Sequence, residues 1–148
     1  MTATLTATLI AVLAPLAAMS AQSLRLEIEV PPRVTAGDTV PITVRAINDA
    51  GAPLELYLLG RSVTFDVTVA RADDRTVVWR RLEGQTIPAI LQIRVLAPGD
   101  SLQLEHAWDQ RGNGGGVVGA GTYTVTATIH TDSKPLSSPS APLRIMER

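Results

Sequence analysis

Groups capable of acid–base or nucleophilic chemistry are few in this chain. The sequence holds two histidines, His106 and His130, and no cysteine. The lack of cysteine excludes a thiol nucleophile, a disulfide and a thiolate metal site. A Ser-His-Asp triad can be assembled on paper from Ser101, His106 and Asp66, but no nucleophile elbow or oxyanion-hole motif accompanies these residues. His106 falls on the apolar face of an expected strand, where a packed imidazole is favoured over a catalytic one. We therefore predict that the protein is not an enzyme.

The segment 109–116 carries residue types that metal and phosphate loops use. Asp109-Gln110-Arg111-Gly112-Asn113-Gly114 resembles the start of a calcium loop, yet a cation, Arg111, stands at the third position and Ala120 replaces the bidentate glutamate. A phosphate loop needs a helix after its glycines and an adjacent Lys-Ser or Lys-Thr pair, and both are missing. We expect a glycine-rich hairpin turn here, with no metal and no cofactor.

Charge and aromatic content narrow the classes of partner. Thirteen basic residues nearly balance fourteen acidic ones, so the composition offers no electrostatic case for binding nucleic acid. Trp79 and Trp108 are the only tryptophans in a chain with 3% aromatic residues. One interpretation is that the two indole rings form an exposed binding platform, but we expect both rings to pack in the core.

Alternating apolar and polar residues dominate after Ala21, and no segment there keeps a helical period. Turn signals rich in Gly, Pro, Asn and Asp separate the alternating runs. This pattern predicts an all-β fold, an immunoglobulin-like antiparallel β-sandwich of about eight strands over residues 22–148. The expected strands are 24–30, 40–46, 54–58, 63–69, 76–79, 91–95, 102–108, 123–129 and 143–146.

The first 21 residues have the outline of a secretory signal peptide. No charged side chain occurs before Arg25, residues 5–18 are mainly apolar, and Ala18-Met19-Ser20-Ala21 offers small residues for cleavage. A cleaved signal is favoured, an uncleaved anchor comes next, and a buried helix last, because the apolar run is short for a membrane span. The segment predicts an exported protein, periplasmic or extracellular, that contacts a membrane only if the segment stays uncleaved.

Three segments together resemble the intracellular proteinase inhibitor (BsuPI-type) family, a bacterial immunoglobulin-like domain. They are Phe65–Val69 with Val77–Arg80, then Leu91–Ser101, and then Trp108-Asp109 through the glycine-rich turn to Gly121-Thr122-Tyr123. The resemblance covers about residues 40–131. The structural signature that it points to consists of Phe65, Trp79, Pro98, Gly99, Trp108, Asp109, Gly121 and Tyr123.

The resemblance implies a non-catalytic protein-binding module whose partner is another protein, with a serine protease as one candidate. A rigid sandwich would present such activity on loops, of which 83–89 and 110–120 are the candidates. The glycines of the second loop argue against rigidity, which leaves Gly84, Gln85, Thr86, Ile87 and Pro88 as the favoured binding loop. The alternative is a structural or adhesive module of the cell envelope, in which the edge strand 54–58 accepts a partner strand.

Overall fold

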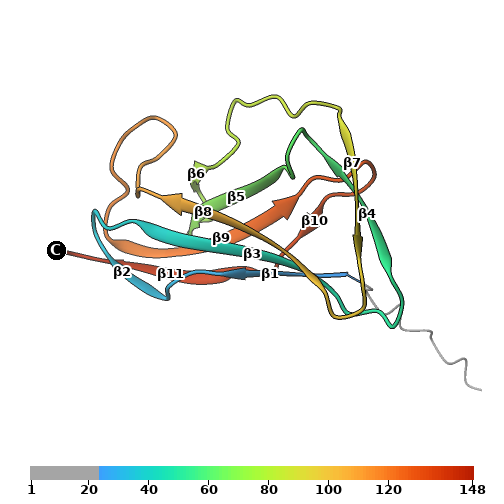
Figure 1. Ribbon diagram of the computed structural model, residues 1–148. Coiled ribbons are helices and arrows are strands. Elements are labelled where there is room, and N and C mark those ends of the chain that lie inside the picture. Colours follow the sequence, from blue (N-terminus) through green and yellow to red (C-terminus); the bar gives the residue numbers. More distant parts are fainter. Residues whose placement is uncertain (1–23) are drawn as a thin grey trace, which may run out of the picture.

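The computed structural model describes residues 24–148, which form an all-β structure (Figure 1). The strands are β1 (Leu24–Glu29), β2 (Arg33–Thr35), β3 (Val40–Asn48), β4 (Leu54–Leu59), β5 (Phe65–Arg71), β6 (Val77–Arg80), β7 (Leu91–Leu96), β8 (Ser101–Trp108), β9 (Gly121–Ile129), β10 (Leu136–Ser137) and β11 (Ala141–Met146). The predicted all-β class is confirmed. The signal-peptide prediction for residues 1–21 lies outside the described residues.

Two sheets pack face to face as a β-sandwich. One has the order β1-β3-β8, and the other has the order β2-β11-β9-β5-β6 with β10 beside β9. Their pairs are antiparallel except β2 with β11. The chain changes sheet between β1 and β2, where Pro31-Pro32 interrupts the ladder because proline cannot donate a backbone hydrogen bond.

A third, two-stranded sheet pairs β4 with β7 and stands at one end of the sandwich, at the right of Figure 1. It extends the β3–β8 pair beyond a bend, since β4 follows β3 and β7 precedes β8. The buried Asn48 holds this bend: its amide donates to Ala52 O and Leu96 O, both at 2.9 Å. Its backbone exchanges hydrogen bonds with Gly99 and Asp100.

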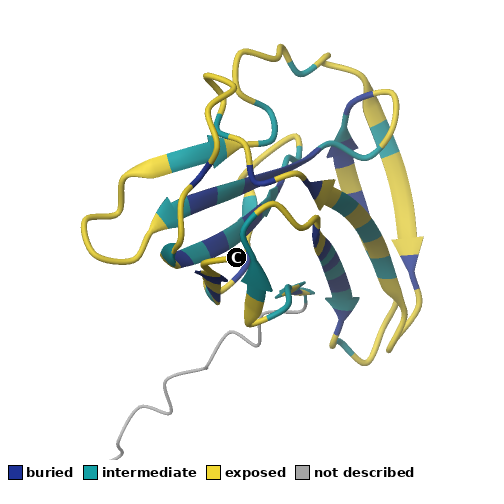
Figure 2. Cartoon of the chain, turned by 90° about the vertical axis from the view of Figure 1, so that its left-hand side faces the viewer, coloured by how far each residue is buried: buried dark blue, intermediate teal, exposed yellow. Residues whose placement is uncertain are grey.

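The core follows the alternation of the long strands. Buried positions recur every second residue in β3 and β9, as a strand with one face on the core requires (Figure 2). The fully buried side chains are mainly Val, Ile and Leu, with Trp108 the largest. The sandwich is therefore packed by branched aliphatic residues, as the low aromatic content demands.

Alternation alone misplaces two sets of side chains. Asp66, expected to face solvent between Phe65 and Val67, is 3% exposed because residues 80–82 fold over it. On β7 the apolar residues Leu91, Ile93 and Val95 are 49%, 57% and 61% exposed. Their sheet overhangs the end of the sandwich, so the outer face of β7 has no layer above it.

Candidate functional site

Two of the predicted structural side chains, Trp79 and Trp108, form an aromatic stack with His106. The centroid of the Trp79 ring lies 5.5 Å from that of His106 and 5.4 Å from that of Trp108, with interplanar angles of 13° and 26°. Trp79 belongs to β6 and the other two to β8, so the stack joins the edges of the two sheets. Ser101 stands five residues from His106 on the same strand, about 16 Å away, which is too far for a triad.

The favoured binding loop begins at a buried carboxylate. Oδ1 of Asp66 accepts the N–H of Leu82 at 3.0 Å, and Oδ2 accepts Nε of Arg80 at 2.5 Å. Between them, the N–H of Arg81 donates to Val67 O at 2.9 Å. These bonds fasten residues 80–82 to β5, so the loop leaves the body of the protein in a fixed direction.

Past this anchor the loop is exposed. Gly84, Gln85, Thr86 and Pro88 are exposed, whereas Ile87 is half-buried and borders a small pocket with Thr64 and Leu82. The Gln85 N–H closes a turn on Leu82 O at 3.0 Å, and Gly84 has the positive φ (69°) that glycine adopts without strain. The backbone of residues 86–89 makes no hydrogen bond to any part of the chain that the structure describes. Backbone donors and acceptors without partners can pair with another chain.

The loop ends as firmly as it begins. Ile90 O accepts the N–H of Gly60 at 2.8 Å, and Leu91 then starts the pairing of β7 with β4. The exposed apolar side chains of Leu91, Ile93 and Val95 continue directly from the loop along the outer face of β7. We call this row of three the β7 strip.

The second candidate loop, 110–120, is tied down despite its glycines. Asn113 accepts the Arg80 N–H at 2.7 Å and donates to Arg80 O at 2.8 Å, which imitates a strand pair. Arg111 bridges to Val117 across the loop, and a Cβ on Gly112 would come within 2.9 Å of Val78 O. The loop is therefore more ordered than its composition indicates.

Two further side chains fix the base of this second loop. The Tyr123 hydroxyl donates to Gly119 O at 2.7 Å. Gln110 was not singled out by the sequence, yet it is 1% exposed and bonds the turn before β3 at three points. Its amide donates to Thr35 O and Asp38 O at 2.8 and 2.7 Å and accepts the Gly37 N–H at 3.1 Å.

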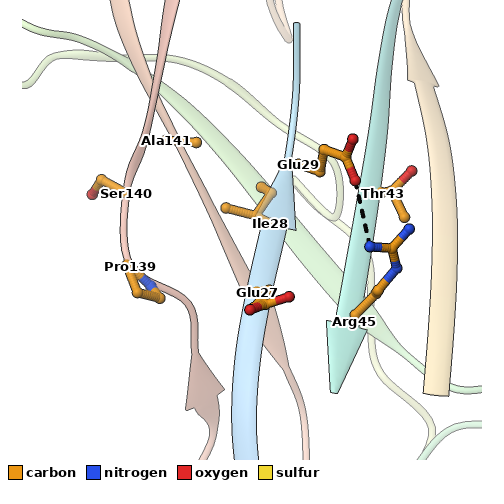
Figure 3. Close-up of a pocket in the computed structure, with 8 residues that line it drawn as sticks. All are labelled: Glu27, Ile28, Glu29, Thr43, Arg45, Pro139, Ser140 and Ala141. Carbon is orange, nitrogen blue, oxygen red and sulfur yellow. Dashed lines mark ion pairs between the residues drawn. The ribbon is translucent and has the colours of Figure 1, made fainter. Parts of the chain in front are cut away.

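A groove on the opposite side of the sandwich lies between β1 and residues 139–141 (Figure 3). Its charged side chains satisfy one another: Arg45 lies 3.5 Å from Glu29, and the nearby Glu27 pairs with Arg25. The described residues hold no group of three or more His, Cys, Asp or Glu arranged for a metal ion. Within residues 24–148 no helix is long and apolar enough to cross a membrane.

The expected free edge at residues 54–58 is not free, which corrects that prediction. β4 pairs with β7 on one side, and on the other side residues 130–132 bond to it. Leu59 N donates to His130 O, and Asp132 N donates to Tyr57 O, both at 3.1 Å. The open edge of this sheet belongs to β7.

These features define a β-sandwich that presents an anchored, exposed loop beside an apolar strip. The chain belongs to the intracellular proteinase inhibitor family (BsuPI), whose model matches residues 27–134. The match extends on both sides of residues 40–131, where the sequence resemblance lies. A search of the curated proteins finds no match.

Several solved structures are similar to this chain at low identity. The sporulation control protein from Bacillus subtilis is 9% identical with a TM-score of 0.48, over 85% of this chain and 49% of that one. A β-glucosidase from Erythrobacter marinus is 11% identical with a TM-score of 0.47, over 84% of this chain and 15% of that one. A CARDB domain from Pyrococcus furiosus is 16% identical with a TM-score of 0.44, over 84% and 87%. The chain spans less than half the length of the first two.

Family membership corrects the predicted location. Residues 1–21 led us to expect an exported protein, but the family is described as an intracellular proteinase inhibitor, which conflicts with export. The uncharged N-terminus was the whole basis of that prediction, and it lies outside the matched segment.

Proposed function

We propose that this protein inhibits a serine protease by presenting Gly84, Gln85, Thr86, Ile87 and Pro88 to the protease cleft. The observation that carries the proposal is the contrast between the fixed ends of the loop and its free middle. Asp66 and Gly60 hold the two ends, while residues 86–89 offer unpaired backbone. Family membership supports an inhibitory role and a proteinase as the partner.

An inhibitory loop must enter the cleft without a large loss of conformational freedom, because ordering costs reduce affinity. Pro88 restricts the backbone, since its ring fixes φ near −65°. Ile87 is half-buried and borders a small pocket together with Thr64 and Leu82. The fixed ends and Pro88 therefore limit the conformational freedom that the loop loses on binding.

The β7 strip gives the protease a second surface to cover. Leu91, Ile93 and Val95 follow the loop within a few residues, and exposed apolar side chains that adjoin a loop are typical of protein interfaces. We propose that the protease contacts the loop and the strip together. We also propose that the sandwich is of the immunoglobulin type, since the bond from Tyr123 to Gly119 O corresponds to a tyrosine corner.

A panel of subtilisin-like and trypsin-like serine proteases tests the proposal. Purified protein should slow at least one protease in a dose-dependent manner. Replacing residues 84–88 with Gly-Ser-Gly-Ser-Gly keeps the length but removes shape and side chains, and should weaken inhibition by about tenfold or more. A matched control changes the other loop, by Gly114→Ser with Gly116→Ser, where an added Cβ meets open space. The control should inhibit as the natural protein does.

The outcomes separate the parts of the proposal. If no protease in the panel is inhibited, a serine protease is not the target. If the loop replacement inhibits as well as the natural protein while the β7 substitution Ile93→Lys does not, the strip and not the loop carries the inhibition. A loss of inhibition in the control instead would place the activity in the loop 110–120.

A further inference from the structure

Arg81 occupies an unusual position between the two sheets. Its Nη1 donates to Phe65 O at 2.6 Å, and its guanidinium carbon lies 4.2 Å above the centre of the Phe65 ring. Together with the bond from its N–H to Val67 O, these contacts hold the side chain half-buried in one orientation.

This fixed cation has no carboxylate. Over residues 24–148, no carboxylate oxygen forms an ion pair with Arg81, whereas its neighbour Arg80 is paired with Asp66. Asp66 cannot serve both, since its oxygens accept Arg80, Leu82 and Val67. Burial lowers the pKa of Arg81, with Asp66 opposing the shift, and its Nε is buried without a partner. A partly buried charge without a counter-ion costs free energy that an anionic ligand would offset.

An open groove lies beside Arg81. This groove of about 310 Å³ is lined by Trp79, Arg81, His106, Ala107, Trp108 and Asp109. The three stacked rings of Trp79, His106 and Trp108 form the aromatic part of this lining. Nη2 of Arg81 makes no hydrogen bond within residues 24–148, so it has donors to offer.

We propose that this groove binds a carboxylate carried on a short aliphatic stem, with the carboxylate on Arg81 and the stem against Trp79 and His106. Nη2 of Arg81 can donate a charge-assisted hydrogen bond to a carboxylate oxygen. Asp109 stands at the rim, where Arg111 partly neutralises it through its N–H at 3.1 Å and its Nε at 3.9 Å. That nearby negative charge disfavours a dianion such as sulfate and leaves a monoanion as the fitting ligand. The site does not depend on protease inhibition, because a small carboxylate tests it directly.

Titration of the natural protein with sodium propionate, followed by NMR at constant ionic strength, tests the site. Propionate should shift the Nε–Hε signal of Arg81 and the indole signal of Trp79 saturably in the millimolar range, and should raise the pKa of His106 because a bound anion stabilises imidazolium. Sodium chloride and sodium sulfate at matched ionic strength should produce no saturable shift.

Three variants test whether the propionate-dependent shifts arise from binding at Arg81. Arg81→Gln should weaken propionate binding by about tenfold or more, since a charge-assisted pair is lost. Arg144→Gln is the matched control, because Arg144 lies on β11, three strands from β6, and should bind unchanged. Asp109→Asn should strengthen binding several-fold by removing the rim charge, and it serves as the deciding variant if Arg81→Gln does not fold.

Equal responses to propionate and chloride would overturn the proposal, as would unchanged binding in Arg81→Gln or weaker binding in Asp109→Asn. The source of the carboxylate follows from a second probe. Tighter binding of N-acetyl-glutamic acid N-methylamide than of propionate would support an acidic side chain of a partner protein. The reverse order would support a free carboxylate.

Discussion

Replacing Asp66 with alanine should destabilise the whole protein and loosen the start of the loop 83–89. The carboxylate is 3% exposed and accepts two backbone N–H groups, from Leu82 and Val67, besides the guanidinium of Arg80. The Arg80 side chain is 47% exposed, so water screens its ion pair with Asp66. We therefore assign little stabilisation to this pair.

The stability lost in Asp66→Ala therefore depends mainly on the two backbone N–H groups that the carboxylate accepts. A hydrogen bond to a charged acceptor contributes about 1.5–3 kcal/mol, and leaving a buried donor unpaired costs a similar amount. Because Leu82 is only half-buried, we expect a total loss of about 2–4 kcal/mol for Asp66→Ala. With a mid-range urea dependence of about 2 kcal/mol per M, the unfolding midpoint should fall by roughly 1–2 M.

Urea unfolding followed by tryptophan fluorescence measures this loss, and amide exchange at Leu82 reports the local effect. The matched control is Asp49→Ala, which removes an exposed aspartate bonded to Arg25 at 2.7 Å and should change stability by no more than about 0.5 kcal/mol. Asp66→Asn keeps one acceptor and should fall between the two. Equal midpoints for Asp66→Ala and Asp49→Ala would refute the reasoning that Asp66 anchors the loop.

Three further substitutions probe the second loop and the aromatic stack. Gln110→Ala removes three hydrogen bonds at a buried position and should lower the free energy of unfolding by about 2–4 kcal/mol. The control Gln103→Ala changes an exposed residue and should lower it little. Similar losses in both variants would contradict the role assigned to Gln110. Asn113→Ala should speed amide exchange and proteolysis in residues 112–117 while costing only about 1 kcal/mol of global stability, and unchanged exchange would show that the two bonds to Arg80 do not order the loop. Burial, followed by the charge of Arg81, lowers the pKa of His106 from its usual 6.5, and Asp109 opposes this shift. The imidazole therefore takes up a proton more readily in the unfolded chain than in the folded protein. The free energy of unfolding should therefore decrease as pH falls through 6.5 and below, and His106→Gln should show a smaller decrease between pH 7.5 and pH 5.

The sequence predicts most of the strands because their alternation is local. Each of the nine expected segments contains a strand, and the structure adds only β2 and β10, which have three and two residues and are too short to show a period. Trp108 also packs in the core as expected, since it continues the inward face of its own strand.

The errors arise where a distant segment decides burial. Asp66 alternates as a solvent-facing residue and becomes buried only because Arg80 and Leu82 fold over it. The order of the glycine-rich loop comes from Arg80, which is 33 residues away from Asn113. Ile93 has the pattern of a core residue, and its exposure follows from the bend at Asn48, which carries β7 beyond the opposite sheet. No local pattern contains this information.

The stacking of Trp79 on Trp108 has a spectroscopic consequence. Two indole rings 5.4 Å apart and 26° from parallel lie close enough for their electronic transitions to mix. Circular dichroism of this protein should therefore contain an exciton couplet in addition to the signal of its strands. Because one ring belongs to β6 and the other to β8, the couplet should disappear when the two sheets separate at this edge, even with every strand still formed. The protein thus carries an optical reporter of the contact between its sheets.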